Sequence, residues 1–102
     1  MAKLIVLYKR PKDPKAFDAY YFSTHIPIAK KIPGLRKYTV HTGPIMTPGG
    51  PAPVHLIANL EFDNMAAIQT AFASPEGQAA AADVQTFATG GADMLMSDTR
   101  VV

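Results

Sequence analysis

One stretch in the first half of the chain constrains the fold more than any other, because a helix, a stop signal and a strand follow one another within it. From about residue 15, apolar and aromatic side chains recur at helical spacing at Phe17, Tyr21, His25 and Ile28. At this spacing they share one helix face. Pro27 cannot donate a backbone hydrogen bond, and it disfavours the helical conformation in the residue before it. We therefore predict that the helix kinks or restarts just after His25.

The stop signal and the strand come directly after this helix. Pro33 and Gly34 end the helical segment, since glycine readily takes the left-handed conformation of a helix cap. The following residues predict a strand over 35–42, with Arg36 and Tyr38 on the same face. The imidazole of His25 lies on the apolar stripe of the helix, so a kink beside it would direct the ring toward a cleft.

Apolar periodicity predicts two further strands. A short run over 3–9 places Leu4, Val6 and Tyr8 on one face of the first strand. Strict alternation over 54–62 places one apolar set under the helices and puts His55 and Asn59 on the opposite face. Between the strands, residues 43–53 hold four Pro and three Gly, which predicts a loop without regular structure.

Capping signals define the second half of the chain. Asp63 or Asn64 is expected to cap one helix, and Ser74, followed by Pro75, is expected to cap another. This last helix is rich in alanine through Ala82. A final strand is predicted over 94–101.

The resulting order of elements, β-α-β-β-α-β, is the split βαβ or ferredoxin-like arrangement. We expect one α+β domain over residues 1–102, with an antiparallel four-stranded sheet and helices on one face only. The bare face carries too much Ile, Val and Leu to remain in water, and a domain of 102 residues is marginal alone. Two such sheets are therefore predicted to pack face to face as a homodimeric α/β barrel.

Four features of the chain together point to a known family: the strand over 3–9, the spacing of Tyr20, His25 and Pro27, the run IPGLRKY over 32–38 and the LEFD over 60–63. They resemble the EthD family, which takes its name from a protein encoded with an ethyl tert-butyl ether degradation system. The resemblance covers nearly the whole chain and implies the dimeric α/β-barrel superfamily. For the name-giving protein the implied role is an accessory one.

Composition excludes several classes of protein. The chain has no Cys, so it can form neither a disulfide nor a thiolate nucleophile or metal site. No segment is apolar enough to span a membrane and no signal peptide pattern opens the chain, which predicts a cytoplasmic protein without a membrane partner. The net charge is +2, and the basic residues are not interleaved with aromatic ones, so no nucleic-acid partner is expected.

His25 and Tyr38 are the candidate catalytic residues. An imidazole with an ordinary pKa near 6.5 can act as a general acid or base close to neutral pH; the alternative is a structural His bonded to a backbone carbonyl. Tyr38 could donate its hydroxyl to a developing oxyanion, or simply pack beside the helix. In related barrels, including relatives of muconolactone isomerase, residues matching these two have acid–base or substrate-orienting roles, which the resemblance implies here.

Five further residues are predicted to contact a small hydrophobic ligand: Tyr8, Tyr21, Arg36, His55 and Asn59. Arg36 could hold a carboxylate with two hydrogen bonds, or pair with an acid across the dimer. His55 and Asn59 are expected to converge on a cavity from one strand face. The three His residues have no recognised metal-ligand spacing and no Gly-rich phosphate loop is present, so neither a metal nor a cofactor is expected.

Two functions remain open from the sequence. The first is cofactor-independent acid–base chemistry on a small, hydrophobic, oxygenated compound, such as isomerisation, cyclisation or oxidation in a catabolic or secondary-metabolite pathway. The second is a non-catalytic protein that binds such a compound or assists a degradation system. A haem-handling barrel ranks last, since it would need an accessible His and a larger cavity.

Overall fold

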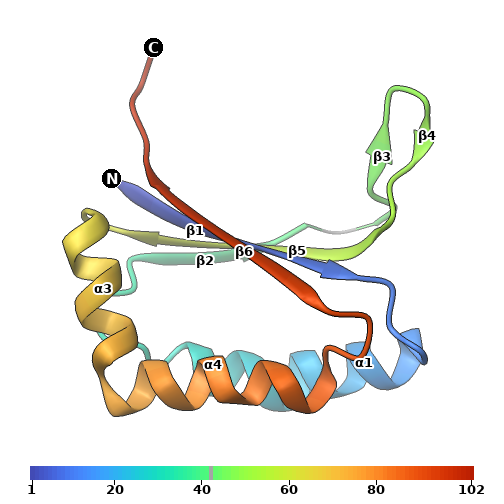
Figure 1. Ribbon diagram of the computed structural model, residues 1–102, viewed down its shortest axis with the longest axis horizontal. Coiled ribbons are helices and arrows are strands. Elements are labelled where there is room, and N and C mark those ends of the chain that lie inside the picture. Colours follow the sequence, from blue (N-terminus) through green and yellow to red (C-terminus); the bar gives the residue numbers. More distant parts are fainter. Residues whose placement is uncertain (42) are drawn as a thin grey trace.

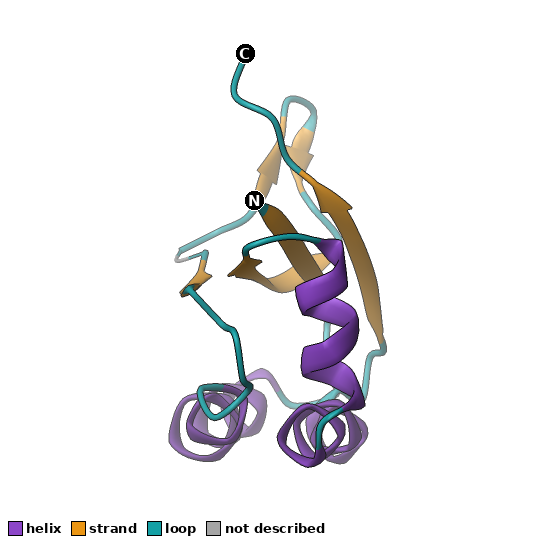
Figure 2. Cartoon of the chain, turned by 90° about the vertical axis from the view of Figure 1, so that its left-hand side faces the viewer, coloured by secondary structure: helices purple, strands orange, loops and turns teal. Residues whose placement is uncertain are grey.

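The computed structural model describes residues 1–41 and 43–102 and has the predicted α+β architecture. Four strands form one antiparallel sheet in the order β2-β5-β1-β6. They are β1 (Ala2–Lys9), β2 (Lys37–Val40), β5 (Val54–Phe62) and β6 (Ala92–Asp98). The helices cover one face of the sheet and leave the other face bare (Figures 1 and 2). The ferredoxin-like arrangement expected from the order of elements is therefore confirmed.

The first helical segment consists of three pieces, α1 (Pro14–Tyr20), the π-helical turn η1 (Tyr21–His25) and α2 (Ile26–Ala29). Asp13 caps its start by accepting the N–H of Ala16. In η1 the N–H of Ile26 reaches back five residues to the carbonyl of Tyr21. A hydrogen bond over five residues makes this turn wider than a regular α-helical turn. Pro27 explains the wider turn, because a proline ring clashes with the carbonyl four residues earlier in a regular helix. The predicted restart after His25 is confirmed.

The two helices of the second half begin where capping signals place them. Asn64 accepts the N–H of Ala67 at 2.7 Å and caps α3 (Met65–Ala73). Ser74 accepts the N–H of Gly77 at 3.0 Å and caps α4 (Pro75–Phe87). Both caps satisfy a backbone donor that has no partner within its own helix.

Strand boundaries differ from those predicted, because each strand is limited by its neighbour. β6 covers Ala92–Asp98 rather than 94–101, since its partner β1 pairs with it only from Tyr8 back to Ala2. β2 covers Lys37–Val40 within the predicted range 35–42. Its backbone contacts with β5 extend from Arg36 to His41. Position 42 lies outside the described residues.

The prediction of an irregular loop over 43–53 was wrong in part. A small hairpin forms there from β3 (Met46–Thr47) and β4 (Gly50–Pro51), which projects from one end of the sheet (Figure 1). The hydroxyl of Thr47 donates to the carbonyl of Gly50 at 2.8 Å. Gly50 has a φ of 135°, a conformation that favours glycine, and this allows the tight turn.

The core lies between the sheet and the helices. Alternation along β5 correctly predicted which of its side chains face the helices, and on β1 the face with Leu4, Val6 and Tyr8 does so. The buried side chains on this side of the sheet are Leu4, Val6, Tyr8, Leu56, Ala58, Leu60 and Phe62. On the bare face Ile5, Leu7 and Ile57 are half-buried, and Leu95 is 56% exposed. In the described part of the chain, no helix is both long enough and apolar enough to cross a membrane.

Candidate functional site

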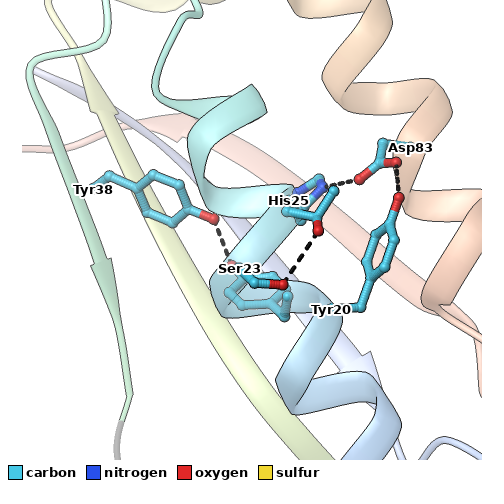
Figure 3. A network of polar contacts seen from close by, with 7 residues as sticks. Tyr20, Ser23, His25, Tyr38 and Asp83 are labelled. Carbon is cyan, nitrogen blue, oxygen red and sulfur yellow. Dashed lines mark hydrogen bonds and ion pairs between the residues drawn. The ribbon is translucent and has the colours of Figure 1, made fainter.

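His25 lies at the end of the π-helical turn, between the sheet and helix α4. Its side chain is almost fully buried, with the whole residue 4% exposed. The ring packs against Phe87, at a centroid distance of 4.7 Å, and against Tyr21. Its Nδ1 atom is 2.8 Å from Oδ2 of Asp83 on α4 (Figure 3). Burial lowers the pKa of His25 more than the nearby Asp83 carboxylate raises it, so the imidazole is neutral near pH 7.

Asp83 is a residue of the candidate site that sequence reasoning missed. Both of its oxygens are engaged, since Oδ1 accepts the hydroxyl of Tyr20 at 2.6 Å (Figure 3). This hydrogen bond raises the pKa of Tyr20. A signal was present in the sequence, because Asp83 follows Ala80 by three residues and precedes Phe87 by four. This spacing places a carboxylate on the buried stripe of an alanine-rich helix.

Three tyrosines converge on the other side of His25. The hydroxyls of Tyr21 and Tyr38 are hydrogen-bonded at 2.5 Å (Figure 3). The Tyr8 ring packs edge-on against Tyr21 at 5.5 Å. Burial raises the pKa of each phenol, and for Tyr8 and Tyr21 the neighbouring Tyr38 raises it further. The three phenols are therefore protonated near neutral pH and can donate hydrogen bonds.

A small cavity lies beside His25, as the sequence predicted. Its volume is about 30 Å³, which is enough for ordered water but far below the ~300–1,000 Å³ of pockets that hold drug-sized ligands. No Lys or Arg among the described residues lines it, so the lining favours an uncharged ligand. The polar side chains of the lining are His25, Tyr8 and Tyr38, and its apolar wall includes Val6, Ala29, Ile32, Leu60, Phe72, Val84 and Met94.

His55 and Asn59 do not converge as predicted. The register between β1 and β5 shifts after Tyr8, so that His55 is skipped and turns toward helix α1. There its ring packs against Phe17 at 4.9 Å, and its Nε2 atom is 2.8 Å from Oδ1 of Asp18. Asn59 stays on the bare face of the sheet, 2.8 Å from Nε2 of His41. Neither side chain lines the cavity beside His25.

Arg36 is also separate from this cavity. Its guanidinium makes two hydrogen bonds to the carboxylate of Asp63 in the same chain, at 3.0 and 2.9 Å. The expected pairing across a dimer is therefore corrected to a pairing within the chain. Both side chains are more than half exposed, and Arg36 lowers the pKa of Asp63. A surface pair of this kind contributes little to stability because water and salt screen it.

The candidate site thus consists of His25, Asp83 and the tyrosines that surround them. Of the seven predicted site residues, the structure brings together His25, Tyr38, Tyr8 and Tyr21. Within residues 1–41 and 43–102, no group of three or more His, Asp or Glu side chains is placed to hold a metal ion. The arrangement offers one neutral base and several phenol donors around an apolar space.

Two close relatives match almost the whole chain. An uncharacterised 11.0 kDa protein from the thcB-thcC intergenic region of Rhodococcus erythropolis is 40% identical over 102 residues, which is 100% of this chain and 98% of the relative. The crystal structure of an EthD family protein from Bacillus halodurans is 35% identical, with a TM-score of 0.90. That match covers 98% of this chain and 99% of the other.

More distant structures share the fold. SnoaB from Streptomyces nogalater, a cofactor-independent oxygenase, has a TM-score of 0.67 at 13% identity, over 99% of this chain and 94% of SnoaB. A ferredoxin-like protein from Bacteroides fragilis, described as dimeric, has a TM-score of 0.65 at 23% identity, over 96% and 95% of the two chains.

The family model for the EthD domain matches residues 9–91, a range that contains His25, Tyr38 and Asp83. The match agrees with the resemblance drawn from the sequence alone, and the two close relatives extend it to both ends of the chain. This chain belongs to the EthD domain family.

Proposed function

We propose that the protein carries out cofactor-independent acid–base chemistry on a small, hydrophobic, oxygenated compound. The observation that carries this proposal is a neutral, buried imidazole that is hydrogen-bonded to a carboxylate and faces an apolar cavity with phenol donors. A neutral His is the form that can accept a proton from a substrate. Isomerisation and cyclisation lie within this class, and oxidation does so where molecular oxygen takes up the electrons of the deprotonated substrate.

His25 would remove a proton from the substrate, and Tyr38 would stabilise the oxygen on which negative charge develops. A phenol with a raised pKa keeps its proton and can donate it in a hydrogen bond to such an oxygen. In this role Tyr21 donates its hydroxyl to the oxygen of Tyr38, which leaves the Tyr38 proton for the substrate oxygen. SnoaB supports the proposal only in that a protein of the same fold is described as a cofactor-independent oxygenase.

A second candidate is a non-catalytic protein that binds a compound or assists a degradation system. The cavity of about 30 Å³ holds no more than ordered water, so either candidate requires the lining to move before an organic compound can enter. Met94, which is 43% exposed, is the lining residue best placed to move, since methionine adapts its shape easily. The two candidates differ in whether a bound compound is converted.

We also propose that the protein is a homodimer in which the bare sheet faces meet. This face presents Ile5, Leu7, Ile57 and Leu95 without a helix to cover them. Apolar side chains on an uncovered sheet face are typical of an association surface. The cytoplasmic location stays a prediction.

The test begins with binding. Small oxygenated hydrophobic compounds are screened by the changes they cause in the NMR signals of His25 and Tyr38. Each binder is then incubated with wild-type protein and with His25→Gln, and products are analysed by mass spectrometry. Product formed by the wild type and reduced ~100-fold or more in the variant supports acid–base catalysis. Equal turnover in both proteins contradicts the role of His25, and binding without product supports the second candidate.

A further inference from the structure

Asp83 is an unusual residue at its position in the fold. Its side chain is only 12% exposed, and its side-chain partners among the described residues are the Tyr20 hydroxyl and the neutral imidazole of His25, neither of them a cation. A carboxylate that is removed from water costs free energy unless it is well paired. Apolar side chains of similar size would pack between α4 and the first helical segment without this cost. The carboxylate is therefore better explained by what it does to its two partners.

The chemistry of the contacts defines the protonation state of the imidazole. A carboxylate accepts hydrogen bonds at both oxygens, so its two partners must donate. Tyr20 donates its hydroxyl to Oδ1, which leaves Oδ2 to accept a proton held on Nδ1 of His25. In a neutral imidazole with Nδ1–H, the other nitrogen, Nε2, carries the free lone pair.

The other ring nitrogen, Nε2, is not fully enclosed by protein. Nε2 has no protein hydrogen-bond partner among the described residues. Every fully buried side-chain N or O atom of these residues does have a partner. Nε2 therefore retains some accessible surface although His25 as a whole is buried. The cavity that His25 lines is the space beside this ring.

We propose that Asp83 and Tyr20 are positioning residues, which hold His25 as the Nδ1–H tautomer with the lone pair of Nε2 directed into the cavity. Asp83 acts on the ring directly, and Tyr20 fixes the carboxylate by engaging its other oxygen. The principle is that of a carboxylate that orients a catalytic histidine. This inference rests on the proposed function, since it assigns the nitrogen that would accept the substrate proton.

A merely structural role makes a different prediction. The hydrogen bonds of Asp83 also connect helix α4 to the first helical segment, so their loss would lower the thermal stability in either case. Only the positioning role requires that the tautomer of His25 changes when the carboxylate is removed. The tautomer is therefore the decisive measurement.

The experiment uses the full chain with ¹⁵N-labelled histidine and reads the two ring nitrogens by NMR at a pH where His25 is neutral. In the wild type, we expect a proton on Nδ1 and none on Nε2. In Asp83→Leu, which removes the acceptor but keeps a side chain of similar size, we expect a mixture of tautomers. Tyr20→Phe should shift the population in the same direction, but less.

The matched control is Asp93→Asn, which removes one negative charge from an exposed pair with Lys9 and should leave the His25 signals unchanged. A proton on Nε2 in the wild type would overturn the proposal even if Asp83→Leu failed to fold. An unchanged tautomer in a folded Asp83→Leu protein would also overturn it, and an unchanged population in Tyr20→Phe would remove Tyr20 from it.

The outcome is independent of whether a substrate is found. If the tautomer behaves as expected and no compound is converted, the positioning holds and the proposed catalysis fails. If a substrate is converted, Asp83→Leu should lower kcat by ~100-fold or more with little change in KM, because the base would be misdirected but the cavity kept. Conversion with an unchanged kcat in that variant would contradict a positioning role.

Discussion

At the scale of single residues, two opposing influences act on the imidazole of His25. Burial disfavours its charged form, and the carboxylate of Asp83 favours it. Burial is the larger influence, so the pKa of His25 is lower in the folded chain than its ordinary value. The same principle acts with the opposite sign on the phenols, where burial disfavours the tyrosinate and raises the pKa.

The lowered pKa of His25 predicts a loss of stability in mild acid. In the unfolded chain, His25 takes up a proton as the pH falls through about 6.5. In the folded chain its pKa is lower, so it takes up the proton only at a lower pH. The free energy of unfolding should therefore fall as the pH decreases below about 6.5, by at most ~1.4 kcal/mol per pH unit from this one group.

Urea unfolding across this pH range measures the effect. His25→Gln, which can still donate to Asp83 but does not titrate, should remove that part of the slope. An identical slope in the variant would mean that His25 does not titrate differently in the folded and unfolded states.

The raised pKa of the tyrosines predicts a second limit at high pH. All four tyrosines of the chain are shifted in this direction. The folded state therefore holds these protons more tightly than the unfolded state, and the resulting stability is present below about pH 10 and lost above it. Tyrosinate absorbance should rise together with the loss of circular dichroism. Half-maximal tyrosinate absorbance near pH 10 in a protein that is still folded would contradict the burial of Tyr8, Tyr21 and Tyr38 and the hydrogen bond from Tyr20 to Asp83.

At the scale of elements, the irregular turn η1 explains why His25 reaches the cavity. The missing N–H of Pro27 and the bulk of its ring widen the helix, and the following residues start a new helical turn. The sequence predicted this interruption because its cause is local. The partner that holds the ring, Asp83, comes from α4, and its contact with His25 depends on how two separate helices pack.

The close approach of α3 and α4 gives a prediction at this scale. A Cβ atom on Gly77 would lie 2.0 Å from the carbonyl oxygen of Ala71 and 2.7 Å from the Cα of Phe72. Both are backbone atoms, so the helices would have to separate. Gly77→Ala should destabilise the fold by ~1–3 kcal/mol, even though alanine favours a helix by itself.

Thermal and urea unfolding measure this change. Gly49→Ala is the matched control, since the nearest atom to its added Cβ is 3.9 Å away, and its effect should stay within ~0.5 kcal/mol. A Gly77→Ala protein as stable as the wild type would mean that the two helices can separate at no cost.

At the scale of the whole molecule, the proposed dimer can be tested through the bare sheet face. Leu95 lies opposite Ile5 in the register of β1 and β6 and is 56% exposed. Light scattering should give twice the 10.9 kDa mass of one chain, and Leu95→Lys should shift the population toward the monomer, because a charge would be buried between the sheets.

Phe22→Lys is the control for this variant, since Phe22 is 52% exposed and lies in η1, in the helical layer on the opposite side of the sheet (Figure 1). It should leave the mass unchanged. A wild-type mass of one chain at micromolar concentration would contradict the dimer.

Local rules in the sequence predicted the order of the main elements, the buried face of β5, the caps of α3 and α4 and the interruption after His25. Each of these depends on side-chain spacing or on the backbone chemistry of Pro, Asn or Ser, which acts over a few residues. The same spacing placed Tyr21 and His25 on one helix face, and it placed Tyr8 on one strand face together with Leu4 and Val6.

The tertiary structure decided which of these side chains meet. The shift in register after Tyr8 turned His55 away from Asn59, and Arg36 found Asp63 in its own chain. The contact of His25 with Asp83, 58 residues apart, depends on the packing of α4 beside the first helical segment. Periodicity along one element gives the direction of a side chain but not its distance from another element, so this pair could only be found in the folded molecule.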